Sequence, residues 1–453
     1  MNQRRVVPYP TVTAFEHHDS ERTHRFDDTP MLPPGPRRVA ARIAPGRYPG
    51  PYNLVTREPG ELFVLFGVYA EIDGCSGAEV AKLRADTLEE EWRVRIVDCS
   101  VDGRWNYMGV LGILPDGDLV VIAADTISRL DPATGATLDR AVLPVNGPVR
   151  DAAYNGYTML GDGTIVAKTV HRFGTDVDGF AAFMAGNPFG APCSTVSAID
   201  PDGFGLRSVI DAPEHIGGRI TSTVLDGRDV VYLVGFNTLH RFAWDGLSLG
   251  IDPSWDGVTV RRDGQTPAPA NAVFGRWTAL QTNAVPSADT MSIHCIDQRD
   301  PSHRSEAKPF ADSGAPVSFL PSMLSVDPEH QRIFSHDSAA GEMVALDVAD
   351  DGALSLRWRV AQRSLSFTTL VGPDDARVVV GTDLPDVSSV PELMTTTVEQ
   401  VVWRDADSGE ELARSADLPR MSPGVLVTPA FDGTMFELGH RGQLTELAVR
   451  SDP

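Results

Sequence analysis

One short pattern recurs along the chain: a strand, an acidic turn that ends in glycine, and a second strand. It reads Ile-Ser-Arg-Leu-Asp-Pro-Ala-Thr-Gly-Ala-Thr-Leu at residues 127–138, and it returns in variant form at 196–206 and 401–412. Several short strands in each period of about 40–50 residues are typical of a β-propeller. The sequence therefore predicts an all-β chain whose 453 residues form a single ring.

The repeats can be counted by aligning them on the third strand of each blade. This strand starts near Val80, Ile127, Val196, Leu239, Met291, Met343, Glu399 and Leu444, and a β-branched or aromatic second strand precedes each start. We expect about eight four-stranded blades, with seven as the alternative. Because the chain ends soon after the last third strand, residues 38–43 are predicted to supply the missing outer strand and close the ring.

Two segments do not resemble a blade. Residues 1–36, which include Glu16, His17, His18 and His24, are interpreted as an arm that lies over the ring or as a disordered tail, and residues 37–453 as the propeller. The second segment, residues 171–193, is inserted in the third blade between its second and third strands. Its aromatic residues favour a packed lid.

Composition excludes several classes of function. A formal net charge of -23 argues against a nucleic-acid partner, because phosphate binding needs clustered positive charge. No apolar run approaches the ~18 residues of a membrane span. The first residues lack the apolar region of a secretion signal, so we expect a cytoplasmic protein. Metal-site spacings such as HExxH or CxxC are absent, as are the phosphate-binding loops.

Propeller topology brings distant polar residues to one end of the channel, where second strands end and third strands begin. We call this the B–C end. Histidines at equivalent blade positions are candidate proton-transfer groups, and arginines are candidate ligands for an anion. The predicted catalytic residues are His171, His336 and Tyr154. The predicted substrate-binding residues are Arg172, Arg219, Asn155, Asn283 and Arg104.

The turn Leu130-Asp-Pro-Ala-Thr-Gly135 and its Asp-Xaa-Xaa-Gly variants resemble the repeat of the quinoprotein-like propellers, over roughly residues 52–450. The resemblance implies the fold, and in true quinoprotein dehydrogenases it also implies a tryptophan at one fixed position of each blade and a pair of adjacent cysteines. Neither feature occurs here. We therefore expect that pyrroloquinoline quinone is not the cofactor, while a metal ion held by several blades stays open.

Three functions remain after these exclusions. The first is an enzyme that acts on a small anionic organic molecule by acid–base chemistry of lyase, isomerase or hydrolase type. The second is a non-catalytic propeller that binds a ligand or a protein at the same end. The third is a metal-dependent oxidoreductase with histidine ligands from several blades. A small-molecule partner is the leading expectation.

Overall fold

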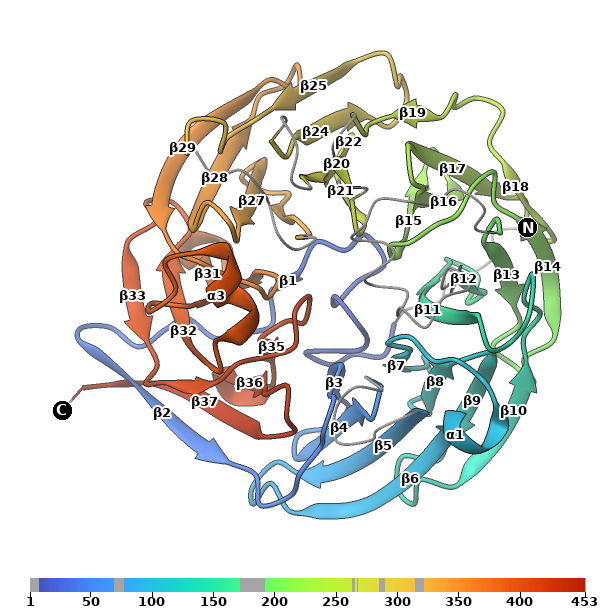
Figure 1. The fold of residues 1–453 in the computed structure, drawn as a ribbon, viewed down its shortest axis with the longest axis horizontal. Coiled ribbons are helices and arrows are strands. Elements are labelled where there is room, and N and C mark those ends of the chain that lie inside the picture. Colours follow the sequence, from blue (N-terminus) through green and yellow to red (C-terminus); the bar gives the residue numbers. More distant parts are fainter. Residues whose placement is uncertain are drawn as a thin grey trace.

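The computed structural model describes residues 8–68, 77–171, 192–262, 265–266, 268–284, 290–313 and 322–452. Eight blades, each with four antiparallel strands, stand around a central channel (Figure 1). The prediction of an all-β propeller with eight blades is confirmed.

The first four blades follow the chain without interruption. They are β3 (Asn53–Thr56), β4 (Glu61–Phe66), β5 (Gly77–Arg84) and β6 (Glu90–Asp98); β7 (Val110–Ile113), β8 (Leu119–Ala123), β9 (Thr126–Leu130) and β10 (Thr137–Val142); β11 (Ala152–Met159), β12 (Ile165–His171), β13 (Thr195–Ile199) and β14 (Leu206–Asp211); and β15 (Ile220–Leu225), β16 (Arg228–Val234), β17 (Thr238–Trp244) and β18 (Leu249–Ile251).

The other four blades complete the ring. They are β21 (Asn271–Phe274), β22 (Trp277–Gln281), β24 (Ile293–Asp297) and β25 (Arg304–Ala307); β26 (Ser325–Asp327), β27 (Arg332–Asp337), β28 (Glu342–Val348) and β29 (Leu354–Ala361); β30 (Thr369–Val371), β31 (Val378–Asp383), β32 (Val398–Asp405) and β33 (Glu411–Arg414); and β35 (Thr428–Pro429), β36 (Thr434–Leu438), β37 (Leu444–Ser451) and β2 (Arg37–Ile43).

Minor elements decorate the ring. They are β1 (Arg25–Phe26), β19 (Val258–Thr259), β20 (Gln265–Thr266), β23 (Asn283–Ala284), β34 (Leu418–Pro419), α1 (Cys99–Asp102), α3 (Val390–Thr395) and the 3-10 turns η1 (Asp374–Ala376) and η2 (Phe431–Gly433). No helix among the described residues is both long enough and apolar enough to cross a membrane.

The ring closes as predicted, by pairing an N-terminal strand with the end of the chain. β2 runs antiparallel to β37, with pairs from Arg37↔Ser451 to Ile43↔Thr445. Figure 1 shows β2, in blue, beside β37, in red. This pairing covers the edge of β37 that would otherwise offer free backbone groups to another chain.

The hydrophobic core lies between neighbouring blades. Second strands such as β8 are buried along their whole length, because blades cover both of their faces, whereas the outer strand β10 alternates between exposed and half-buried residues. One cluster joins Ile122 of the second blade to Ile165 of the third, and another joins Ala279 to Ile333 across the fifth and sixth blades. Burial on two faces explains why the second strands read as continuous apolar runs.

The N-terminal arm lies inside the channel, where Figure 1 shows it in dark blue at the centre of the ring. Its residues hydrogen-bond in chain order to the first strands of the blades. The backbone bonds are Thr56 N to Thr13 O (3.0 Å), Ile113 N to Ala14 O (2.8 Å), Ser222 N to Ser20 O (2.8 Å), Val273 N to Glu21 O (2.9 Å), Val326 N to Thr23 O (3.1 Å) and Leu370 N to His24 O (2.8 Å). The third and eighth blades are reached through the hydroxyls of Ser20, which donates to Met159 O, and Thr13, which donates to Pro429 O.

This arrangement has a simple physical reason. The first strand of each blade is an edge strand whose outward backbone groups face the channel, and an extended segment can satisfy them. β1 completes the contact by pairing in parallel with β30. The arm therefore forms an inner ring that touches all eight blades.

Candidate functional site

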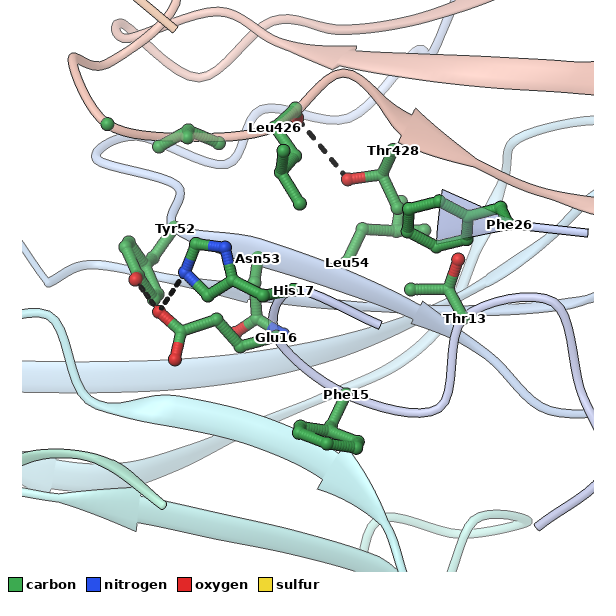
Figure 2. A pocket seen from close by; sticks show the side chains of 12 residues that line it. Thr13, Phe15, Glu16, His17, Phe26, Tyr52, Asn53, Leu54, Leu426 and Thr428 are labelled. Carbon is green, nitrogen blue, oxygen red and sulfur yellow. Dashed lines mark hydrogen bonds and ion pairs between the residues drawn. The ribbon is translucent and has the colours of Figure 1, made fainter. Parts of the chain in front are cut away.

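The arm places a buried carboxylate, Glu16, on the channel axis. Arg219, just before β15, lies with Nε 2.7 Å from Glu16 Oε1, and Arg22 of the arm lies with Nη1 3.5 Å from Oε2. The Tyr52 hydroxyl donates to Oε1, and His17 Nε2 lies 3.1 Å away. Figure 2 shows Glu16, His17 and Tyr52 around a small cavity of about 20 Å³, which is room for one or two waters.

These charges shift one another's protonation. Burial alone would raise the pKa of Glu16, but Arg219 and His17 lower it to about 2, so the carboxylate is charged. Burial lowers the pKa of His17 to about 4 in spite of Glu16, and that of Arg22 to about 10. One carboxylate thus offsets two buried guanidinium groups, and the imidazole beside it is neutral.

The backbone of the arm is strained around this network. His17, His18, Arg22 and His24 have φ values of 61°, 71°, 56° and 58°, in the left-handed region that side chains with a Cβ rarely adopt. Such conformations persist where the surroundings over-determine them, and they cluster at functional sites. His17 Nδ1 is 2.8 Å from His24 Nε2, and His24 Nδ1 is 3.0 Å from Thr368 O, which fixes two of these residues.

A second group of buried basic residues lies in the third and fourth blades. Lys168, on β12, donates from Nζ to Asn155 Oδ1 at 2.5 Å and to Ile216 O at 3.0 Å. Both acceptors are neutral, and among the described residues no carboxylate is in ion-pair contact with Nζ. Burial lowers the pKa of Lys168 well below its ordinary value, and the nearby Arg219 lowers it further.

Two histidines, His171 and His215, lie near this lysine, and burial together with its charge lowers the pKa of both. His171 ends β12, its backbone N donates to His215 Nε2 (3.1 Å), and the two rings lie 5.8 Å apart. His171 Nε2 is 2.8 Å from Asn146 O, while its buried Nδ1 has no hydrogen-bond partner among the described residues. Burial lowers both pKa values, that of His215 to about 3. We call Lys168, His171 and His215 the basic cluster.

Two of the other predicted residues, Asn283 and His336, lie near each other but apart from the basic cluster. Asn283 Oδ1 accepts from Ser322 N (3.3 Å), and the Ser322 hydroxyl lies 3.3 Å from a ring nitrogen of His336, so these two predicted residues share one serine. Burial lowers the pKa of His336 to about 4.

Tyr154 and Arg104 are held by partners within the ring. The Tyr154 hydroxyl donates to Pro144 O (2.6 Å) and lies 2.8 Å from Ser197 Oγ. Arg104 pairs with Asp125 (2.6 Å) and Asp102 (3.3 Å). Arg172, together with residues 172–191 of the predicted lid, lies outside the described residues.

Arg219 and Asn155 do come together, but the contacts differ from the predicted role. Arg219 Nη1 donates to the backbone oxygen of Asn155 (2.9 Å), Nη2 donates to the Tyr52 hydroxyl, and Nε faces Glu16. Each guanidinium nitrogen therefore has a partner in the protein. The anion that Arg219 holds here is Glu16.

Two carboxyl groups lie buried between the seventh and eighth blades. Glu399 on β32 accepts from Met421 N at Oε1 (2.8 Å), and Glu437 on β36 is likewise buried. Burial raises the pKa of Glu399 to about 8, and burial and Glu399 together raise that of Glu437. Burial thus favours the neutral form of both acids.

No three His, Cys, Asp or Glu side chains in the described part of the chain are grouped so that they could hold a metal ion. The cavity beside Glu16 is large enough for water and too small for an organic ligand.

Sequence reasoning missed Glu16, Arg22 and Lys168. A signal existed for Lys168, because a lysine interrupts the apolar run Ile165–His171 of a second strand that is buried on both faces. For Glu16 and Arg22 no spacing rule applies, since only the threading of the arm brings them to the axis.

The comparisons with known proteins support the fold. No family model and no curated protein matches the chain. Quinohemoprotein alcohol dehydrogenase from Comamonas testosteroni is similar in structure, with a TM-score of 0.57 and 12% identity over 100% of this chain and 82% of that one. The Dos1 propeller is similar with a TM-score of 0.52 and 7% identity, over 91% of this chain and 95% of that one. At these identities the likeness shows the fold alone, an eight-bladed β-propeller.

Proposed function

We propose that this propeller acts on a small anionic organic molecule at the B–C end of its channel, by acid–base chemistry in which the basic cluster accepts the proton. The observation that supports this most is the environment of Lys168. Burial beside two neutral acceptors, with no carboxylate of the described residues in ion-pair contact, lowers the pKa of this amine well below its ordinary value, and an amine shifted in this way is a competent base or nucleophile.

An anion is the substrate that this cluster favours. Burial lowers the pKa values of Lys168, His171 and His215 because it penalises their charged forms. A carboxylate beside them would offset that penalty, raise their pKa values and draw a proton onto the cluster. His336, which lies at the same end, remains a candidate for a second proton-transfer step, and the lyase, isomerase or hydrolase outcome depends on the substrate.

The test is a screen of small hydroxy- and oxo-carboxylates, followed by NMR, with matched variants. Lys168→Met and His171→Gln should each lower turnover by about 10²–10⁴-fold with the fold retained. Lys82→Met is the control, because Lys82 is ion-paired to Glu61 (2.7 Å) and Glu91 (3.0 Å) in the first blade. Full activity in Lys168→Met would refute the proposal.

A non-catalytic binding propeller is the second candidate, and the arm favours it. The residues of the arm lie in the channel, and the guanidinium of Arg219 is hydrogen-bonded to the protein itself. Ligands that bind at the B–C end without turnover, with equal affinity in the Lys168→Met variant, would support this function instead.

A further inference from the structure

Lysine is scarce in this chain, which makes its place in the interior informative. Only three of the 39 lysine and arginine residues are lysines, namely Lys82, Lys168 and Lys308. Lys82 is ion-paired to Glu61 (2.7 Å) and Glu91 (3.0 Å) in the first blade. Lys168 is fully buried, and its amine donates to two neutral oxygens instead. Of these two strong bases lysine is the one whose charge burial can remove, so position 168 holds a cation that its surroundings can switch off.

A β-bulge shapes the surroundings of Lys168. In the pairing of β11 with β12 the register shifts between Tyr154 and Tyr157, so that Asn155 and Gly156 both face Lys168. Gly156 has a φ of 105°, which side chains with a Cβ rarely adopt. Bulges re-aim side chains and are frequent beside active sites. Here the side-chain oxygen of Asn155 faces Lys168 and accepts from Nζ at 2.5 Å.

The same asparagine connects Lys168 to the arm. The backbone oxygen of Asn155 accepts from Arg219 Nη1 at 2.9 Å, and Arg219 Nε lies 2.7 Å from Glu16 Oε1. A Cβ at Gly156 would lie 3.1 Å from Cδ of Arg219 and 3.5 Å from Glu16 Oε2, so the bulge packs directly against this ion pair. A continuous series of contacts therefore runs from the arm carboxylate to the buried amine.

The charges along this path disfavour a proton on the amine. Glu16 faces both Arg219 and Arg22, so these three groups already carry one net positive charge. A proton on Lys168 would add a second positive charge in a region from which water is excluded. Burial, Arg219 and Arg22 accordingly lower the pKa of Lys168, and Glu16 opposes them. A proton on the amine would also disfavour protonation of the two histidines in the basic cluster.

We propose that the arm sets whether Lys168 carries a proton, with Glu16 and Arg219 as positioning residues for the base of the reaction. Arg219 holds Asn155 beside the amine and keeps a positive charge near it, and Glu16 moderates that charge. A change at the channel axis thereby alters the base in the third blade without contact with the substrate. This inference rests on the proposed function, in which Lys168 accepts the proton.

NMR of the lysine side chains tests the proposal on the full chain and needs no substrate. Protein labelled with ¹³C-lysine should give three ε-carbon signals, and Lys168→Met identifies the signal of Lys168. That signal should titrate at a lower pH than the signal of Lys82, whose carboxylate partners raise its pKa in spite of partial burial. If the two lysines titrate together, the proposed function is refuted, and this inference falls with it.

Variants that change one charge on the path then test the control by the arm. Arg219→Met removes a positive charge and should raise the titration midpoint of Lys168 by about one pH unit, whereas Glu16→Gln removes a negative charge and should lower it by about as much. A loosened structure would admit water and raise the midpoint in both variants. Shifts in the same direction, or none, would overturn this inference, while a low midpoint in the unmodified chain would still support the proposed function.

A second pair of variants applies if Glu16→Gln does not fold. Arg219→Lys keeps the charge but loses the hydrogen-bond geometry that Arg219→Met also loses, so it should leave the midpoint of Lys168 nearly unchanged. Equal shifts in these two variants would show that Arg219 is only structural and would overturn the inference.

Controls make the same changes in net charge elsewhere. Arg129→Met acts at the ion pair with Asp118 (2.6 Å) in the second blade, and Glu89→Gln acts at an exposed turn. Neither should move the midpoint of Lys168. Shifts as large as those of the path variants would mean that the overall charge of the protein decides the protonation of Lys168, and the inference would be wrong.

Discussion

Two groups of polar side chains toward opposite ends of the channel differ in chemistry, although the same strands run between them. Toward the B–C end Lys168, His171 and His215 are buried, and burial lowers the pKa of each. Toward the other end, where first strands turn into second strands, Asp19, Glu21 and Asp229 line a cavity, and Asp19 is half-buried. The arm lies between the two groups. The same ring thus places basic side chains in its interior and acidic side chains around a cavity.

The contacts of two of the carboxylates on the arm, Glu16 and Asp19, illustrate a similar contrast. Glu16 is 4% exposed and faces two guanidinium groups, whereas Asp19, three residues later, accepts from the backbone and hydroxyl of Thr23. A buried ion pair depends on both partners, and a carboxylate with neutral donors does not. Four variants test this comparison, in order of expected effect.

Removing residues 1–36, with β2 kept, should open the channel from one end to the other and cause the largest loss of stability. The deletion exposes the edges of the first strands and leaves Arg219 buried without Glu16. We expect a loss of at least about 5 kcal/mol in the free energy of unfolding, or no cooperative urea transition at all. Removal of residues 1–7 alone is the control. If the truncated chain kept the melting temperature of the full chain, the arm would not contribute to the stability of the ring.

Glu16→Gln should cost about 3–5 kcal/mol in urea unfolding, because it leaves two guanidinium groups buried without a counter-charge. The double variant with Arg219→Met should recover part of that loss, since it removes one of the uncompensated charges. Additive losses in the double variant would show that the two residues are not energetically coupled.

The buried acids predict how stability depends on pH. The folded pKa of Glu399 is about 8, above that of an unfolded glutamate, so its neutral form stabilises the fold fully at low pH. This contribution is lost as the pH rises through 8. Relative to Glu399→Gln, the protein should lose about 2–4 kcal/mol between pH 5 and pH 9, measured by urea unfolding at each pH. Glu89→Gln, at an exposed turn, should show the pH dependence of the unmodified chain.

Asp19→Asn should have the smallest effect, below about 1 kcal/mol, because the amide oxygen can still accept from Thr23. Chemical denaturation of this variant beside Glu16→Gln compares the two arm carboxylates directly. A loss as large as that of Glu16→Gln would mean that Asp19 also balances a buried cation, and the contrast between the two carboxylates would fail.

The architecture follows from the sequence because its determinants are local. Each second strand is an apolar run such as Leu119–Ala123, and each acidic turn places its glycine where the backbone needs a positive φ, as at Gly135 (73°). The position of β2 could be predicted too, because the last blade lacks an outer strand and the segment before the first blade can pair with its exposed edge. The strand–turn–strand pattern at residues 127–138 thus indicates the repeat of the propeller from twelve consecutive residues.

The contacts within the candidate site could not be predicted from the sequence, because the tertiary structure decides them. Sequence placed Arg219 and Asn155 at the same end, and they do meet, but only the path of the arm through the ring decides that Glu16 is the partner of Arg219. Contacts between residues that lie about 200 positions apart leave no periodicity in the chain. The pKa shifts are decided in the same way: the pKa of Lys168 is lowered and that of Glu399 is raised because the fold removes water from them, and burial is a property of the whole ring.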